Sequence, residues 1–135
     1  MFKIDHLMIE VGEPQKVATC VAEHLGLPFA WPLTEKDEYT SIGINFGDIN
    51  IEFINFRVRF GIEGVGFRGF SGIAFEAADL GVSIKRLDGS GIHYRIGEEC
   101  EAHTTLPMEE DQIFPTLFLV KYHFGIGLLL PSPCH

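Results

Sequence analysis

Hydrophobic and polar residues alternate along several short segments of the chain, which is the period of a β-strand with one buried face. In residues 3–11, Leu7 and Ile9 fall on one face, while His6 and Met8 fall on the other. Two other stretches carry apolar residues at helical spacing, with proline before the first and glycine after both. The predicted strands are residues 3–11, 29–33, 39–46, 49–56, 69–76, 92–96, 116–122 and 126–130, and the predicted helices are residues 15–25 and 79–87.

The order of these elements repeats, because a strand, a helix and three strands occur twice. Aligning the two halves lays His6 on Gly72 and Glu52 on Leu128. The length of 135 residues fits one domain. We therefore expect an α+β fold in a single domain of residues 1–135, with a first module of about residues 1–57, a connector of about residues 58–69 and a second module of about residues 70–135.

Charge and composition exclude several classes of partner. The formal net charge is −9, so a phosphate backbone or an anionic membrane surface would be repelled. We therefore expect no nucleic-acid and no membrane partner. Three widely spaced cysteines, Cys20, Cys100 and Cys134, do not form a disulfide framework, which predicts a cytoplasmic protein with reduced thiols.

Two segments between the predicted strands invite a functional interpretation. Residues 64–69 match G-x-G-x-x-G, but a strand follows instead of a helix, so we reject a dinucleotide site. Residues 97–115 contain six acidic residues and no lysine or arginine. Such a segment is either a solvated loop or a lid in which Leu106 or Met108 contacts a bound molecule.

His6 and Glu52 are the candidate catalytic residues. Each lies in an alternating strand whose opposite face is apolar, so both side chains point away from the predicted helix-packed core. On an exposed sheet they would be two solvated polar residues. In a cleft they would form an acid–base set or part of a metal site.

The chain resembles the vicinal oxygen chelate superfamily, which includes glyoxalase I, extradiol dioxygenases and bleomycin-resistance proteins. The resemblance rests on the repeated element order and on three segments: residues 4–7 (Ile-Asp-His-Leu), residues 24–28 (His-Leu-Gly-Leu-Pro) and residues 45–54 (Asn-Phe-Gly-Asp-Ile-Asn-Ile-Glu-Phe-Ile). It implies that the two modules form a curved mixed sheet, with the helices on its outer face and a small-molecule site in the cup. It also implies a homodimer.

In metal-dependent members of this superfamily, four positions on the first and fourth strands of the modules bind a divalent ion. The resemblance places these positions at His6 and Glu52, which can bind a metal, and at Gly72 and Leu128, which cannot. It therefore implies an incomplete metal site.

The same face is predicted to contact the ligand through Met8, Asn45, Leu119 and Lys121. Lys121 would either form a structural ion pair with Glu52 or hold an anionic group of the substrate.

Two classes of function follow from these residues. The first is a binding protein of the bleomycin-resistance type, which holds a small molecule and has a degenerate metal site. The second is a metal-dependent lyase, isomerase or dioxygenase that uses His6 and Glu52.

Overall fold

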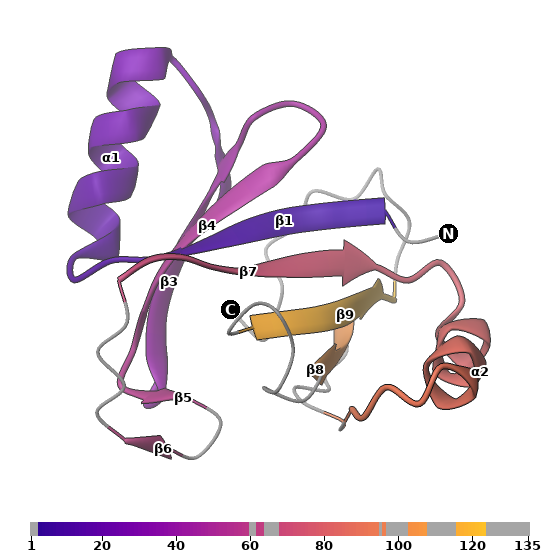
Figure 1. Ribbon diagram of the computed structural model, residues 1–135. Coiled ribbons are helices and arrows are strands. Elements are labelled where there is room, and N and C mark those ends of the chain that lie inside the picture. Colours follow the sequence, from indigo (N-terminus) through magenta and orange to yellow (C-terminus); the bar gives the residue numbers. More distant parts are fainter. Residues whose placement is uncertain are drawn as a thin grey trace. The chain divides into compact units, whose positions relative to one another are not determined.

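In the computed structural model of the chain, the described residues are 3–59, 62–63, 68–94, 96, 103–107 and 116–123. Figure 1 labels their helices and strands along the chain. The elements are β1 (Lys3–Glu10), α1 (Pro14–Leu25), β2 (Phe29–Glu35), β3 (Tyr39–Asn45), β4 (Asn50–Phe56), β5 (Val58–Arg59), β6 (Ile62–Glu63), β7 (Gly69–Glu76), α2 (Leu80–Gly89), β8 (His103–Pro107) and β9 (Thr116–Tyr122).

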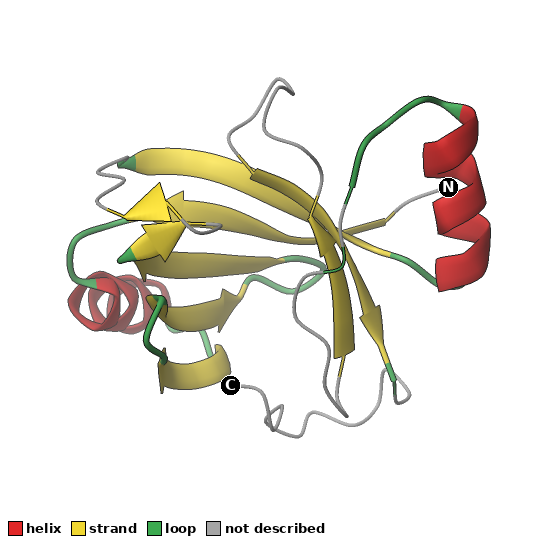
Figure 2. Ribbon diagram, turned by 90° about the horizontal axis from the view of Figure 1, so that it is seen from below, coloured by secondary structure: helices red, strands yellow, loops and turns green. Residues whose placement is uncertain are grey.

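Strands outnumber helices among these elements, as Figure 2 shows in yellow and red. Seven strands follow the order β2-β3-β4-β1-β7-β9-β8 in a mixed sheet, and β5 pairs with β6 separately. The predicted α+β class with a mixed sheet is confirmed. The chain divides into two compact units between residues 71 and 72, and residues 1–5 belong to the second unit. No helix of the described residues is long and apolar enough to span a membrane.

Helix α1 packs on β3 and β4, as Figure 1 shows. It begins with Pro14, whose missing N–H costs nothing in the first turn, and ends at Gly26, which has a φ of 64°. The helix buries Ala18 and Ala22, whose small side chains allow close approach to the strands. The core that it covers consists of Ala18, Ala22, Ile42, Ile44 and Phe53, with Ile9, Val11, Val17, Val21, Leu27, Leu33, Phe46 and Ile51 packed around it.

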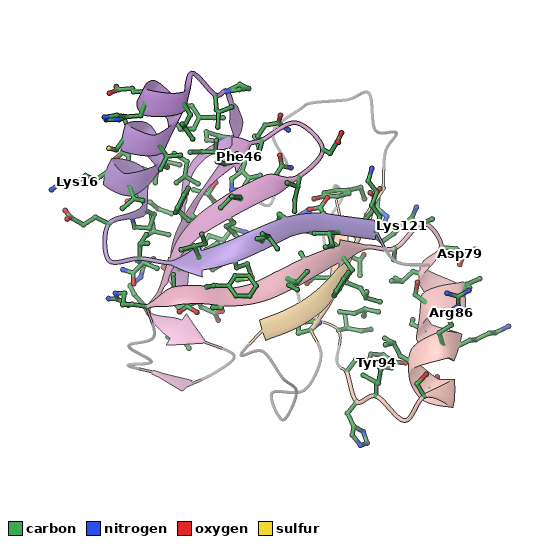
Figure 3. The ribbon with its side chains drawn as sticks, turned by 45° about the horizontal axis from the view of Figure 1, so that its top comes forward. Lys16, Phe46, Asp79, Arg86, Tyr94 and Lys121 are labelled. Carbon is green, nitrogen blue, oxygen red and sulfur yellow. The ribbon has the colours of Figure 1, made fainter. Side chains whose placement is uncertain are left out.

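This core confirms the predicted faces of the first half. Ile42, Ile44 and Phe53 all belong to it, and Figure 3 shows Phe46 among the side chains near α1. Because side chains alternate along a strand, the residues between them point to the opposite face. That face carries His6 and Glu52.

The second unit repeats the pairing of the first. Strand β1 runs parallel to β4, and the N–H of Val11 donates to Ile54 O; strand β7 runs parallel to β9, and the N–H of Ala77 donates to Val120 O. These two bonds make Val11 equivalent to Ala77 and Ile54 equivalent to Val120. Counting back along the strands, His6 then corresponds to Gly72, as predicted, but Glu52 corresponds to Phe118. The predicted alignment of Glu52 with Leu128 is therefore wrong, and Leu128 lies outside the described residues.

The cause of this error is strand β8, which the sequence analysis did not predict. Residues 103–107 pair antiparallel with β9, within the segment considered as a lid or a loop. Leu106 is fully buried in a core with Ala77, Leu87 and Leu119, so it is no lid residue. Met108 and the predicted strand 126–130 lie outside the described residues, and no strand spans residues 92–96 among those described.

Candidate functional site

His6 and Glu52 come together in the first unit. Met8, two residues after His6, is the register partner of Glu52 on β4, so the two side chains meet diagonally across neighbouring strands. His6 Nε2 lies 3.2 Å from Glu52 Oε1. The residues are only 6% and 7% exposed, respectively, and face away from α1. A carboxylate and an imidazole at this distance can exchange a proton.

A chain of hydrogen bonds holds the other oxygen of Glu52. The Ser41 hydroxyl donates to Glu52 Oε2 at 2.5 Å, and the Trp31 indole Nε1–H donates to Ser41 Oγ at 3.1 Å. Ser41 is fully buried. Because a bond to an ionised group is stronger than one between neutral groups, the contact between Ser41 and Glu52 favours the carboxylate form.

Trp31 also contacts His6 directly. The two rings are 5.4 Å apart between centroids and inclined at 71°, in an edge-to-face arrangement. The indole lies where Gly43 has no side chain, since a Cβ built at Gly43 would stand 2.4 Å from the ring. Gly43 is the register partner of Glu52 on β3, so the missing side chain lies beside the pair.

Met8 and Asn45, the predicted ligand contacts of the first unit, have different roles. Met8 is 3% exposed, so its side chain is buried on the same face as His6. Asn45 serves the β3–β4 turn: its Oδ1 accepts from the N–H of Gly47, and its Nδ2 donates to Asn50 Oδ1 at 2.8 Å. A ligand would have to compete with these bonds for the Asn45 amide.

Leu119 and Lys121 do not lie on the face that the sequence analysis predicted for them. Leu119 is fully buried in the core that includes Leu87 of α2. Lys121 Nζ donates to Ala78 O at 2.7 Å, just before α2, and Figure 3 shows Lys121 near Asp79. The physical reason is the alignment error: β9 corresponds to β4 and not to β3, which exchanges the two faces of the strand.

Two side chains of the first unit, His6 and Glu52, have the chemistry to bind a divalent ion. Neighbouring ligands with bonds of about 2.1 Å stand about 3.0 Å apart in an octahedral site, close to the 3.2 Å between His6 Nε2 and Glu52 Oε1. However, the described residues contain no group of three or more His, Cys, Asp or Glu side chains able to hold a metal. The corresponding positions of the second unit carry Gly72 and Phe118. The described residues therefore do not provide a complete metal site.

Trp31, Ser41 and Gly43 belong to this site and are not among its predicted residues. A signal for Ser41 was present, because it alternates with Ile42 and Ile44 and so shares the face of Glu52. Trp31 had no such signal. Register shifts lie on both sides of it in β2, so its facing does not follow from alternation.

Several solved structures have the same fold as this chain at low sequence identity. The chain's sequence matches no protein-family model and no curated protein.

Three of these structures cover nearly all of the chain. Methylmalonyl-CoA epimerase from Mycobacterium tuberculosis has a TM-score of 0.72 at 14% identity, over 98% of this chain and 89% of that one. A variant of Streptomyces coelicolor methylmalonyl-CoA epimerase, in complex with 2-nitronate-propionyl-CoA, has a TM-score of 0.73 at 12% identity, over 90% and 98%. A hypothetical protein from Bacillus halodurans C-125 has a TM-score of 0.72 at 12% identity, over 94% and 99%. At these identities the likeness establishes the fold alone.

Proposed function

We propose that this chain is an isomerase that removes and returns a proton on the carbon next to the carbonyl of a small acyl thioester, with His6 and Glu52 as its acid–base pair. The observation that carries the proposal is the buried contact of 3.2 Å between these side chains on the face opposite α1. The two epimerases of the same fold support the substrate class, since one was crystallised with an acyl-CoA analogue.

The separation within the pair favours proton transfer on one face of the substrate. Two bases that attack a carbon from opposite sides each need about 3 Å to it, and so stand about 6 Å apart. At 3.2 Å, His6 Nε2 and Glu52 Oε1 act as one unit. Inversion of the carbon would therefore require an acid outside this pair, or rotation of the intermediate before the proton returns.

The proposed step starts with Glu52 as a carboxylate. Its Oε1 takes the proton, and the electron pair of the C–H bond becomes the carbon–carbon double bond of an enolate, with the negative charge on the former carbonyl oxygen. The proton is shared between Glu52 and His6 while the intermediate lasts. After the intermediate has rotated, return of the proton to the opposite face of the carbon gives the inverted centre and restores the carbonyl and the carboxylate.

Deuterium exchange tests this proposal. Methylmalonyl-CoA in D₂O is incubated with the protein, and NMR follows loss of the α-proton against the uncatalysed exchange. We expect catalysed exchange in the wild type and a loss of about a hundredfold or more in Glu52→Gln, which keeps the shape of the side chain but removes the base. Lys16→Gln, an exposed change on α1, is the control that should leave exchange unchanged. No exchange with any of several acyl thioesters would refute the proposal.

A second candidate is a binding protein without catalysis, which the incomplete ligand set favours. The positions corresponding to His6 and Glu52 in the second unit are Gly72 and Phe118, so the pair has no counterpart there. Such a protein would bind an acyl thioester in calorimetry with similar affinity in the wild type and in Glu52→Gln, and would exchange no deuterium.

The assembly and the compartment remain predictions. A homodimer follows only from the family resemblance, and a cytoplasmic location from the reduced thiols that the cysteine spacing predicts. Light scattering of the purified chain tests the first of these.

A further inference from the structure

The hydrogen-bond chain that ends on Glu52 has a fixed direction. An indole N–H donates and cannot accept, so Trp31 Nε1 occupies one lone pair of Ser41 Oγ. The Ser41 hydroxyl then has a single proton to give. The direction of the Ser41 O–H bond therefore depends on which acceptor the proton can reach.

The acceptor of that proton is Glu52 Oε2. Ser41 is fully buried, and within the described part of the chain its hydroxyl has two hydrogen-bond partners, Trp31 and Glu52. If Oε2 of Glu52 carried a proton, it would donate to Ser41, and the Ser41 proton would be left buried without an acceptor. That arrangement is unfavourable, so Oε2 stays an acceptor.

The two oxygens of Glu52 therefore have different tasks. Oε2 is fixed by Ser41 at 2.5 Å, and Oε1 is turned toward His6 Nε2 at 3.2 Å. The other carboxylate on this face of β1 is that of Glu10, which alternates with His6 and Met8 and pairs in register with Ile54. The Ser41 hydroxyl donates to Glu52 and, among the described residues, not to Glu10. Ser41 therefore orients only the carboxylate that lies beside His6.

We infer that Ser41 is a positioning residue, which holds Glu52 Oε2 so that Oε1 alone exchanges protons, and that Trp31 sets the direction of the Ser41 hydroxyl. The inference rests on the proposed function for its kinetic consequence. Its geometric part stands without it.

An NMR experiment tests the geometric part without any substrate. Trp31 is the chain's single tryptophan, so its indole N–H gives one signal in a ¹H–¹⁵N spectrum. We expect this signal to move upfield in Ser41→Ala, because the hydrogen bond is lost, and to return toward its wild-type position in Ser41→Thr, which keeps a hydroxyl. Ser83→Ala, which removes another buried hydroxyl on α2, should leave the signal in place. An unmoved signal in a folded Ser41→Ala protein would overturn the inference.

The kinetic part uses deuterium exchange of methylmalonyl-CoA. In Ser41→Ala we expect kcat to fall about tenfold to a hundredfold with KM nearly unchanged, the effect of losing one hydrogen bond to a charged group. Ser41→Thr should recover most of the rate, and Ser83→Ala should keep it. An unchanged kcat in Ser41→Ala, or an equal fall in Ser83→Ala, would overturn the positioning role.

The two proposals fail in different ways. If the wild type catalyses no exchange, the proposed function is refuted, and the indole signal still decides whether Trp31 donates to the Ser41 hydroxyl. If the wild type is active but Ser41→Ala is equally active, the inference fails and the proposed function stands.

Discussion

Two buried serines of the first unit provide a matched test of how hydrogen bonds stabilise this fold. Ser41 and Ser71 are both fully buried and both lie in strands. Ser41 Oγ bonds to Trp31 and Glu52, whereas Ser71 Oγ has no hydrogen-bond partner among the described residues. Replacing each serine by alanine removes the same atom from two different environments.

The expected changes have opposite signs. Ser41→Ala loses a bond to a carboxylate, worth about 1.5–3 kcal/mol, and leaves the Trp31 indole N–H without its acceptor, for about 1 kcal/mol more. We therefore expect a destabilisation of about 3 kcal/mol. Ser71→Ala removes a buried hydroxyl that has lost its water, a cost of about 1–3 kcal/mol, and leaves a very small void. We expect a stabilisation of about 1 kcal/mol.

Equilibrium unfolding in urea measures both changes on one scale. With a slope of about 2 kcal/mol per M, the midpoint should fall by about 1.5 M in Ser41→Ala and rise by about 0.5 M in Ser71→Ala. Ser83→Ala gives the background effect of losing a buried serine hydroxyl in a helix. Equal losses of stability in Ser41→Ala and Ser71→Ala, with unchanged slopes, would refute the reasoning.

Three further predictions follow from single contacts. Gly43→Ala places a Cβ 2.4 Å from the Trp31 ring, so we expect the free energy of unfolding in urea to fall by about 1–3 kcal/mol. The tryptophan fluorescence should shift to the red, and an unshifted emission would contradict the clash. Asp79→Ala removes the side chain that accepts from the N–H of Val82 at the start of α2, and should cost about 1 kcal/mol in thermal unfolding, whereas Asp79→Ser should cost less. With the two ligands that the described residues provide, Mn²⁺ should bind no tighter than the micromolar range and lose that affinity in Glu52→Ala. Nanomolar binding in calorimetry would show that other residues complete the site.

The first half of the fold follows closely from the sequence because its strands alternate without interruption. Ile42, Ile44 and Phe53 all point to α1 as alternation predicts, and this places Glu52 on the opposite face. Alternation states which face a side chain lies on, but not which side chains touch. The contact between His6 and Glu52 depends on the register of β1 against β4, which only the structure provides.

The second half follows less closely because one strand is short and carries a weak pattern. Residues 103–107, His-Thr-Thr-Leu-Pro, lie in an acidic segment and end in a proline, a combination typical of a loop. If residues 103–107 are not recognised as a strand, β9 is aligned with β3 of the first half, whereas its true counterpart is β4. For that reason alone, the sequence pattern predicts the opposite face of the sheet for Leu119 and Lys121.

The close approach of Trp31 to Gly43 links two positions that lie on different strands. The indole occupies the volume that a side chain at residue 43 would need, so the two positions share one fixed space. Related chains with a larger residue at 43 should carry a smaller one at 31, and the Ser41 hydroxyl would then lose its indole donor. The pair of residues 31 and 43 is thus a marker that can be read in any aligned sequence: tryptophan with glycine predicts an oriented carboxylate at 52, and any other combination predicts a site that works differently.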